Sequence, residues 1–269
     1  MTCACGHNHN AEPHECDSSG TPIALPAPMI ALTGRLICND TAQMMTALGL
    51  LPDHRDLSRA EPGNLRFDLW QDEDPMIWHL SELFRDAAAV AAHQARAADS
   101  PWGRDSAAIT RDVSRAKVTP ALRPEQRGDH DAIDHLLHIA FDGGTEAGLV
   151  RRLRADDDLS LSLVAVAAGT IVGHLALSPV GGDRPALALA PVAVHPAAQG
   201  LGIGSALIRA ALDHAGAAPV VVLGDPAYYS RFGFRPADLT SPYAGPYLQV
   251  RGDLPEGATI AHAPAFAAL

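Results

Sequence analysis

One segment of the sequence has residue types and spacing that predict a phosphate-binding site, the glycine-rich run Gln199-Gly200-Leu201-Gly202-Ile203-Gly204. An apolar segment ending in Val192-Ala193-Val194 precedes it, and a helix is expected from about Gly204 to His214. Glycines allow several backbone N–H groups to converge on one point, and the start of a helix adds partial positive charge. The run therefore predicts a phosphate cradle that requires no lysine side chain.

Three phosphate-binding patterns compete for this run. A dinucleotide loop of the form Gly-x-Gly-x-x-Gly lacks its third glycine, because Ser205 or Leu207 stands there. A Walker loop requires a lysine before Ser or Thr, and the single lysine of the chain is the distant Lys117. The remaining pattern is Gln-x-x-Gly-x-Gly, and a glycine-rich turn without a ligand is the structural alternative.

A second motif accompanies the glycine run. The segment from Tyr229 to Phe234 has the form Tyr-x-x-x-Gly-Phe and follows an expected strand at 219–224. Together the two motifs resemble the acetyl-CoA site of the GNAT acetyltransferase superfamily, over roughly residues 121–236. The segments around 247–250 and 264–266 are similar to one bacterial branch of that superfamily. Leu201 stands where many members have a polar residue, a departure that a site built from backbone tolerates.

This resemblance implies an N-acetyltransferase that moves an acetyl group from acetyl-CoA to an amine of a small molecule or a protein. The strand amides would bind the pantetheine arm beside a gap that Pro191 helps to open, and the loop amides would hold the pyrophosphate. The implied cofactor-binding residues are Val192, Ala193, Val194, Gln199, Gly200, Leu201, Gly202, Ile203, Gly204 and Ser205.

The resemblance also implies an acid that protonates the departing CoA thiolate. Tyr229 matches the motif position, and Tyr228 is the neighbouring alternative. An amine that arrives charged also needs a base, for which Asp225, His174 and His195 are candidates. A helix cap for Asp225 and a strand-end position for His195 are the structural alternatives, and a chain of water molecules is another route for the proton.

Residues 27–117 predict a separate small domain with the element order β-α-β-β-α-β of a ferredoxin-like fold. We expect strands and helices in turn at 29–38, 41–59, 65–70, 76–83, 86–96 and 107–113. This region resembles the antibiotic-biosynthesis monooxygenase superfamily. The points of similarity are the segment 58–64, the acidic turn 72–74, Glu82 at the end of its strand, and Ala-Ala-His at 91–93 in the second helix.

That resemblance implies a homodimer whose sheets form a shared barrel and, in some members, oxygenation of phenolic or quinol substrates without a cofactor. His79, Glu82 and His93 are the polar side chains expected to face the interior, where a His or Glu could take the proton of a phenol. A domain that serves only for dimerisation, with Glu82 and His93 in structural hydrogen bonds, is the alternative.

The first 26 residues are expected to form a flexible tail rich in cysteine and histidine. Its candidate ligands for zinc or copper are Cys3, Cys5, His7, His9, His14 and Cys16. Their spacing fits no closed structural zinc site, so a disordered tail with incidental metal affinity is the alternative. The four cysteines of the chain do not make a disulfide framework, and a reducing bacterial cytoplasm is the expected compartment.

The composition limits the partners and the fold class. The 269 residues are 47% apolar and include 20 basic and 31 acidic side chains, a net charge of −11 that excludes a generally basic surface for nucleic acid. The uncharged stretch from Leu159 to Gly182 predicts a hairpin of two buried strands rather than a membrane span. We therefore expect an α+β protein of two domains, a ferredoxin-like domain at 27–117 and a GNAT-type α/β domain with a mixed sheet at 118–269.

Overall fold

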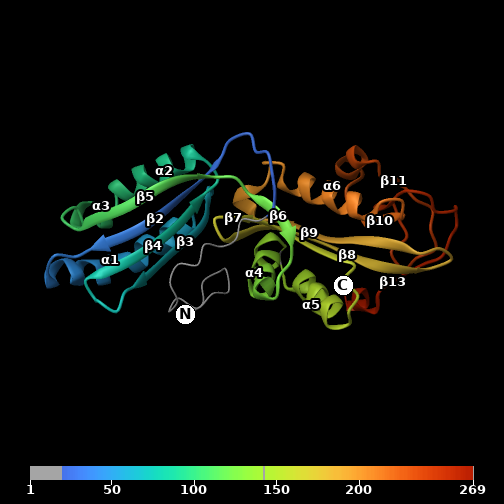
Figure 1. Cartoon of the computed structure of the whole chain (residues 1–269), viewed down its shortest axis with the longest axis horizontal. Coiled ribbons are helices and arrows are strands. Elements are labelled where there is room, and N and C mark those ends of the chain that lie inside the picture. Colours follow the sequence, from blue (N-terminus) through green and yellow to red (C-terminus); the bar gives the residue numbers. More distant parts are fainter. Residues whose placement is uncertain (1–19, 142, 269) are drawn as a thin grey trace.

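The computed structural model describes residues 20–141 and 143–268, whose strands form two sheets placed side by side along the molecule (Figure 1). The metal-ligand candidates of the N-terminal tail, from Cys3 to Cys16, lie outside these residues. Within them, no three His, Cys, Asp or Glu side chains are grouped so that they could hold a metal ion. None of the helices formed by these residues is both long and apolar enough to cross a bilayer.

The first sheet has four antiparallel strands in the order β3-β4-β2-β5, which is the ferredoxin-like arrangement expected from the sequence. Its elements are β2 (Met29–Ile37), α1 (Thr41–Arg59), β3 (Asn64–Gln71), β4 (Ile77–Phe84), α2 (Ala87–Ala98), α3 (Pro101–Asp105) and β5 (Thr110–Val118). The helix α3, which Ser100 caps through the amide of Gly103, was not expected from the sequence. The last strand therefore begins at Thr110 and not near residue 107.

The helices of this domain start where their caps predict and cover one face of the sheet. Asp40 accepts a hydrogen bond from the amide of Gln43, and Asp86 accepts one from the amide of Ala89. All three helices share one apolar core with the sheet. The helices contribute Leu51 (α1), Val90 (α2) and Trp102 (α3), and the strands contribute Leu36, Leu80 and Phe84.

The second sheet is mixed, with one parallel pair formed by β9 and β10. Its strand order is β1-β6-β7-β8-β9-β10-β12-β11, and β13 pairs with β8. Its strands are β1 (Thr21–Pro22), β6 (Ala121–Pro124), β7 (Leu161–Ala167), β8 (Thr170–Gly182), β9 (Ala186–Val194), β10 (Val220–Leu223), β11 (Arg235–Pro236), β12 (Leu248–Arg251) and β13 (Ile260–His262). The pairing of β1 with β6 ties residues to this sheet that the sequence analysis placed in a flexible tail.

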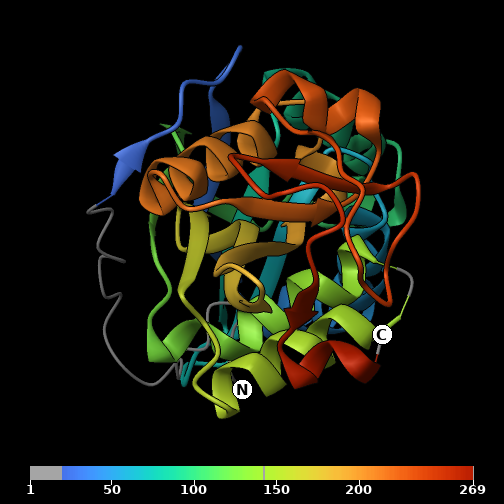
Figure 2. The ribbon, with the colours of Figure 1, turned by 90° about the vertical axis from the view of Figure 1, so that its right-hand side faces the viewer.

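Helices cover both faces of the second sheet (Figures 1 and 2). On one face lie α4 (His130–Ala140) and α5 (Thr145–Ala155), and on the other lies α6 (Ile203–Ala215). A short helix, α7 (Pro226–Tyr229), follows β10. The apolar residues of α4 and α6 recur every three or four positions, so each helix buries one stripe against the sheet.

The face of the first sheet that lies opposite its helices packs against the second domain. Met29 and Leu83 of this face belong to the same apolar core as Ala197 and Ala198 of the short 3-10 turn η2 (Pro196–Ala198). The chain's own second domain thus covers part of the sheet face that a shared barrel would need. The homodimer stays a prediction, and β5 remains exposed along nearly its whole length.

A charged side chain links the two domains beside this core. Arg66 of β3 donates from Nη1 to the carbonyl oxygen of Ala168, in the turn between β7 and β8, and to Oγ1 of Thr170, the first residue of β8, both at 2.7 Å. Its Nη2 donates to Ser81 Oγ at 2.8 Å within the first sheet. One side chain therefore ties β3 and β4 to the β7–β8 hairpin.

Candidate functional sites

The residues expected to bind acetyl-CoA lie where β9 separates from β10. β9 pairs in parallel with β10 at Leu187 and Ala188 and then runs on to Val194 without a further pairing to β10 in the described part of the chain. On its other side the register with β8 shifts after Leu175, opposite Pro191. A bulge or gap at Pro191 was expected from the sequence, because proline cannot donate to a ladder. Backbone at 192–194 is left open toward β10.

The glycine run forms the loop between η2 and α6. Gly200 and Gly202 have φ angles of +79° and +93°, a left-handed conformation that side chains with a Cβ rarely adopt. Gly202 is the N-cap of α6, and no side chain of residues 20–141 or 143–268 caps this helix. The first amides of a helix have no partner within it, so those of Ile203, Gly204 and Ser205 are available to an anion.

The two candidate acids occupy different positions beside this loop. Tyr228 Oη lies 3.2 Å from the point where a Cβ on Gly204 would stand, so its hydroxyl borders the first turn of α6. The ring of Tyr229 lies so close to Gly224, at the end of β10, that a Cβ there would be 2.3 Å from it. Burial raises the pKa of Tyr229 to about 12, so this phenol keeps its proton at neutral pH.

The candidate bases are all held by structural contacts. Asp225 is exposed and caps α7 through the amide of Ala227. His174 is fully buried, with Nε2 at 3.0 Å from Ser162 Oγ, and burial lowers its pKa to about 4. His195 accepts a hydrogen bond from the amide of Ala197, and burial again lowers its pKa to about 4. These contacts favour the structural alternatives given for Asp225 and His195, and they give His174 a structural role as well.

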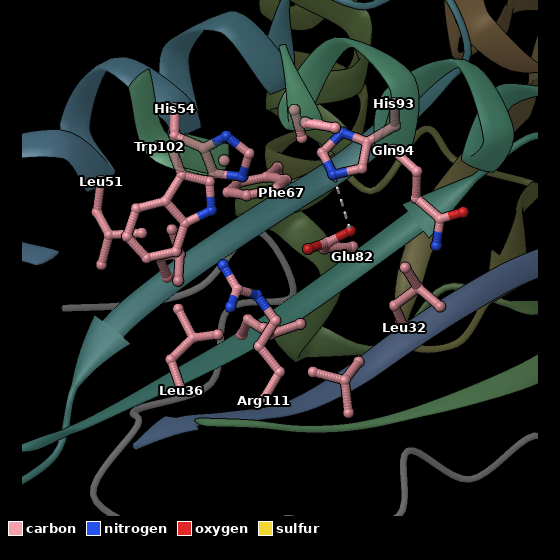
Figure 3. Close-up of a pocket in the computed structure, with 16 residues that line it drawn as sticks. Leu32, Leu36, Leu51, His54, Phe67, Glu82, His93, Gln94, Trp102 and Arg111 are labelled. Carbon is pink, nitrogen blue, oxygen red and sulfur yellow. Dashed lines mark ion pairs between the residues drawn. The ribbon is translucent and has the colours of Figure 1, made fainter. Parts of the chain in front are cut away.

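A cavity of about 370 Å³ lies between the helices and the sheet of the first domain (Figure 3). Its walls are mostly apolar, and the polar groups at its surface come from separate elements: His54 from α1, Glu82 from β4, His93 and Gln94 from α2, and Arg111 from β5. The apolar residues labelled in the figure are Leu32, Leu36, Leu51, Phe67 and Trp102.

Glu82 and His93 face each other across this cavity. Both side chains are 7% exposed, and Oε2 of Glu82 lies 3.9 Å from Nε2 of His93. Glu82 Oε2 is buried and has no hydrogen-bond partner among the residues that the structure describes. Burial, and next the nearby Glu61, raises the pKa of Glu82 to about 8, so a protonated carboxyl is the dominant form at neutral pH.

His93 is oriented by a carboxylate behind it. Its Nδ1 lies 3.0 Å from Oε2 of Glu61, which in turn accepts a hydrogen bond from Arg96 Nε at 2.8 Å. Nδ1 lies closer to this carboxylate, which only accepts, than to Nη2 of Arg96 at 3.4 Å, which only donates. Nδ1 therefore carries the proton, and the lone pair of Nε2 faces Glu82. Burial lowers the pKa of His93 despite the opposing effect of Glu61, so the ring is neutral.

His54 and Trp102 complete the cavity, and the sequence analysis did not propose either of them. Their rings stack at 5.5 Å between centroids with 29° between the planes. Arg96 Nη1 lies 3.2 Å from His54 Nδ1. Burial and the adjacent Arg96 lower the pKa of His54 to about 3. Trp102 lies on α3, the helix missing from the predicted elements.

His79 lies outside the cavity, in contrast to the sequence expectation. It is three residues before Glu82 in β4, and side chains that are an odd number of positions apart in a strand point to opposite faces. Its Nε2 is 2.5 Å from Asp72 Oδ2, and its ring stacks on Trp70 at 5.2 Å. The structure thus brings Glu82 and His93 together and leaves His79 on the outer face of the sheet.

Comparison with known proteins identifies the second domain. Residues 130–234 match the profile of the acetyltransferase (GNAT) family. The N-acetyltransferase YhbS of Escherichia coli K12 is 43% identical over 120 residues, which cover 42% of this chain and 72% of YhbS. The chain belongs to the GNAT acetyltransferase family. A further GNAT relative, the N-acetyltransferase YjhQ of the same strain, is 39% identical over 131 residues, 45% of this chain and 72% of YjhQ.

Structural comparison agrees with this assignment. The crystal structure of Escherichia coli YhbS in complex with CoA aligns with a TM-score of 0.53 and 34% identity, covering 56% of this chain and 94% of that one. In the N-terminal part, residues 47–98 match the profile of the antibiotic biosynthesis monooxygenase family. The GNAT domain therefore follows a monooxygenase-like domain in the same chain.

Two arginines of the GNAT domain that were not selected from the sequence lie against the aromatic rings of Tyr228 and Phe232. The guanidinium of Arg231 lies 4.0 Å from the centre of the Tyr228 ring, and its Nε donates to the carbonyl oxygen of Tyr228. Arg209 of α6 lies 5.7 Å from the centre of the Phe232 ring. Arg231 occupies a variable position of the Tyr-x-x-x-Gly-Phe motif, so the motif itself gives no signal for it.

Proposed function

We propose that the GNAT domain transfers the acetyl group of acetyl-CoA to an amine of a small molecule or a protein. The observation that supports this most strongly is the uncapped start of α6 behind two glycines in the left-handed conformation. These amides would hold the pyrophosphate. The open backbone at 192–194 would bind the pantetheine arm like an added strand. The crystal structure of the relative YhbS is a complex with CoA, which supports CoA as the kind of ligand proposed here.

The charge of the site suits a polyanionic ligand although the chain carries −11 overall. The attraction comes from backbone dipoles at the start of α6, and Arg231 adds a cation on the ring of Tyr228, whose hydroxyl borders this turn. The net charge of a protein acts over its whole surface, whereas these groups act within a few ångströms. A negatively charged protein can therefore bind CoA at this position.

In the proposed reaction the amine nitrogen forms a bond to the carbonyl carbon, and the bond from that carbon to sulfur breaks. An amide N–H of β9 near Val192 would stabilise the negative charge on the carbonyl oxygen. Tyr229 would then donate its proton to the departing thiolate, because its phenol stays protonated well above neutral pH. Water is the proposed acceptor of the amine proton, since Asp225, His174 and His195 are engaged elsewhere.

Two measurements test this proposal. Calorimetric titration with CoA should give saturable binding to the full chain, and release of free thiol from acetyl-CoA should depend on an amine from a panel of small amines and peptides. Absence of CoA binding would overturn the proposal. If CoA binds but no amine causes thiol release, the proposed cofactor stands and the proposed amine acceptor is wrong.

For the monooxygenase-like domain, which we place at 27–117 ahead of a GNAT domain at 118–269, we propose binding of a small molecule and not dimerisation alone. The supporting observation is the cavity with its two buried polar groups, Glu82 and His93. Oxygenation of a quinol is the reaction that the family resemblance implies. Oxygen uptake with a panel of quinols tests this reaction, and the uptake should be lost in His93→Ala. If light scattering shows a dimer and no small molecule binds in the cavity, the dimerisation role is favoured instead.

A further inference from the structure

We propose that the cavity of the monooxygenase-like domain is a proton-transfer site for a small enolisable ketone, with His93 as the base and Glu82 as the acid. The inference rests on the binding role proposed above for this cavity. It assigns an activity that consumes neither oxygen nor any other oxidant. The observations that support it are the cavity, the facing side chains of Glu82 and His93, and the Glu61–Arg96 ion pair behind His93.

The geometry of the pair fits enolisation. The 3.9 Å between Glu82 Oε2 and His93 Nε2 is too long for a direct hydrogen bond, and both atoms border the same cavity (Figure 3). In a ketone, the carbonyl oxygen and the neighbouring C–H group lie side by side along one edge of the molecule. An acid and a base placed next to each other can therefore reach these two positions at once.

The protonation states also fit. His93 Nδ1 donates to Glu61, so Nε2 offers a lone pair to the cavity. The charged or titratable groups that face the pair are His54 from α1, Glu61 from the turn after α1, Arg96 from α2 and Arg111 from β5. Arg96 balances Glu61, while burial keeps His54 neutral. The resting site thus holds a neutral acid beside a neutral base.

Each bond and proton of the proposed step is accounted for. The C–H bond next to the carbonyl breaks, its proton goes to His93 Nε2, and its electron pair forms the new C=C bond. The π electrons of the carbonyl take the proton from Glu82 Oε2, which gives an enol. The resulting imidazolium and carboxylate are opposite charges 3.9 Å apart, and Glu61 further stabilises the imidazolium. Return of the proton to carbon restores both groups.

The walls define the class of substrate. Phe67, Trp102 and the leucines supply flat and aliphatic apolar surface. A volume of about 370 Å³ is at the lower end for ligand pockets, which suits a neutral compound of one or two rings. A charged carboxylate ligand is disfavoured, because Arg111 already donates to Ser106 and Ile109 and no other cation lines the cavity among the described residues.

The test is exchange of the acidic C–H protons of 2-indanone and 2-tetralone, which are both neutral at the pH of the assay, for deuterium, followed by proton NMR with the full chain in D₂O. We expect exchange above the buffer rate. Glu82→Gln and His93→Gln should each reduce it about 100-fold or more, since general acids and bases contribute at least that much. His79→Gln is the matched control, because it makes the same substitution on the outer face of the sheet, and it should leave exchange unchanged.

Calorimetric binding of both ketones and thermal unfolding of each variant separate the outcomes. Loss of exchange in folded variants that still bind the ketones supports the proposal. Binding by the unaltered protein without exchange would overturn the proton-transfer inference and leave the binding role standing. Failure of both ketones to bind, or oxygen uptake with a quinol in the absence of any exchange, would overturn the inference as well. CoA binding to the GNAT domain is independent of all these results.

Discussion

The two candidate sites differ in what they are made of. The proposed GNAT site would use backbone amides from one short stretch of chain, from Val192 to Ser205, whose shape depends on φ angles at Gly200 and Gly202. The cavity of the monooxygenase-like domain uses side chains from three helices and four strands. A backbone site tolerates changes in side-chain type but not in conformation, whereas a side-chain site depends on packing and protonation. The two should therefore fail under different substitutions.

The two sites are also joined through one strand. Phe67 of β3 lines the cavity, while the preceding residue, Arg66, reaches the β7–β8 turn of the GNAT domain. The same strand contacts η2, which leads into the glycine loop. We infer that the domains fold as one unit even though their sites work by different chemistry.

The largest effect is expected at the backbone site. Gly202→Glu should weaken CoA binding about 1,000-fold, because a side chain in the left-handed region costs roughly 1–2 kcal/mol and a carboxylate would stand beside the pyrophosphate. Gly128→Glu is the control, because it makes the same change in charge at an exposed glycine that has open space around it. Calorimetric titration with CoA measures both. Unchanged binding in Gly202→Glu would break the assignment of a backbone site.

Arg66→Ala tests whether the two regions are one folding unit. It removes hydrogen bonds to Ala168, Thr170 and Ser81 from a side chain that is 11% exposed, so the free energy of unfolding should fall by about 3 kcal/mol. Arg35→Ala, which removes an exposed ion pair with Asp112, should cost less than about 1 kcal/mol. Urea unfolding should remain a single transition. A separate early transition in the unaltered protein would show that the domains unfold independently.

A pair of substitutions decides between the two tyrosines. Tyr229→Phe should lower kcat about 100-fold with CoA binding intact, because it removes the proton donor and keeps the ring against Gly224. Tyr228→Phe should instead change mainly CoA affinity, since its hydroxyl borders the first turn of α6. Steady-state kinetics on both variants, with calorimetry for CoA, measures this. A kcat loss confined to Tyr228→Phe would exchange their roles.

One site lies in contiguous sequence and the other is assembled from distant residues, and this difference determines how much of each could be predicted. The glycine loop and the tyrosine motif are each contiguous, so their residues could be selected and ordered along the chain from the sequence alone. The predicted ferredoxin-like order and most element bounds also agree with the structure, because caps such as Asp40 and Asp86 are local signals. The GNAT and monooxygenase-like domains were both recognised from such local segments.

The cavity was predicted only in part because its members are far apart in sequence. Glu82 and His93 were selected from the family resemblance, and only the fold brings their side chains to 3.9 Å. His54 lies within a long helix without a local sign of function, and Trp102 lies on a five-residue helix that composition does not reveal. The placement of His79 could have been corrected from the sequence, since strand alternation separates residues 79 and 82.

The smallest effect is expected in the pH dependence of stability, and it tests the protonated state of Glu82. The folded-state pKa of about 8 is above the ordinary 4.5, so the unfolded chain releases this proton first and stability is lost as pH rises toward 8. His54 and His93, whose folded pKa values are lowered, lose stability only as pH falls below about 6.5, so they do not contribute above it.

As the pH rises from 6.5 to 8, the free energy of unfolding of Glu82→Gln should therefore increase relative to that of the unaltered protein. The increase should be roughly 1.4 kcal/mol per pH unit, up to about 2 kcal/mol. Glu73→Gln, in the exposed acidic turn, should show no such gain. Urea unfolding at the two pH values, followed by tryptophan fluorescence, measures both. Parallel stability curves for Glu82→Gln and the unaltered protein would mean that Glu82 is ionised in the folded state. The cavity would then hold a carboxylate in place of a neutral acid, and the contrast between the two sites would reduce to one between backbone dipoles and fixed charges.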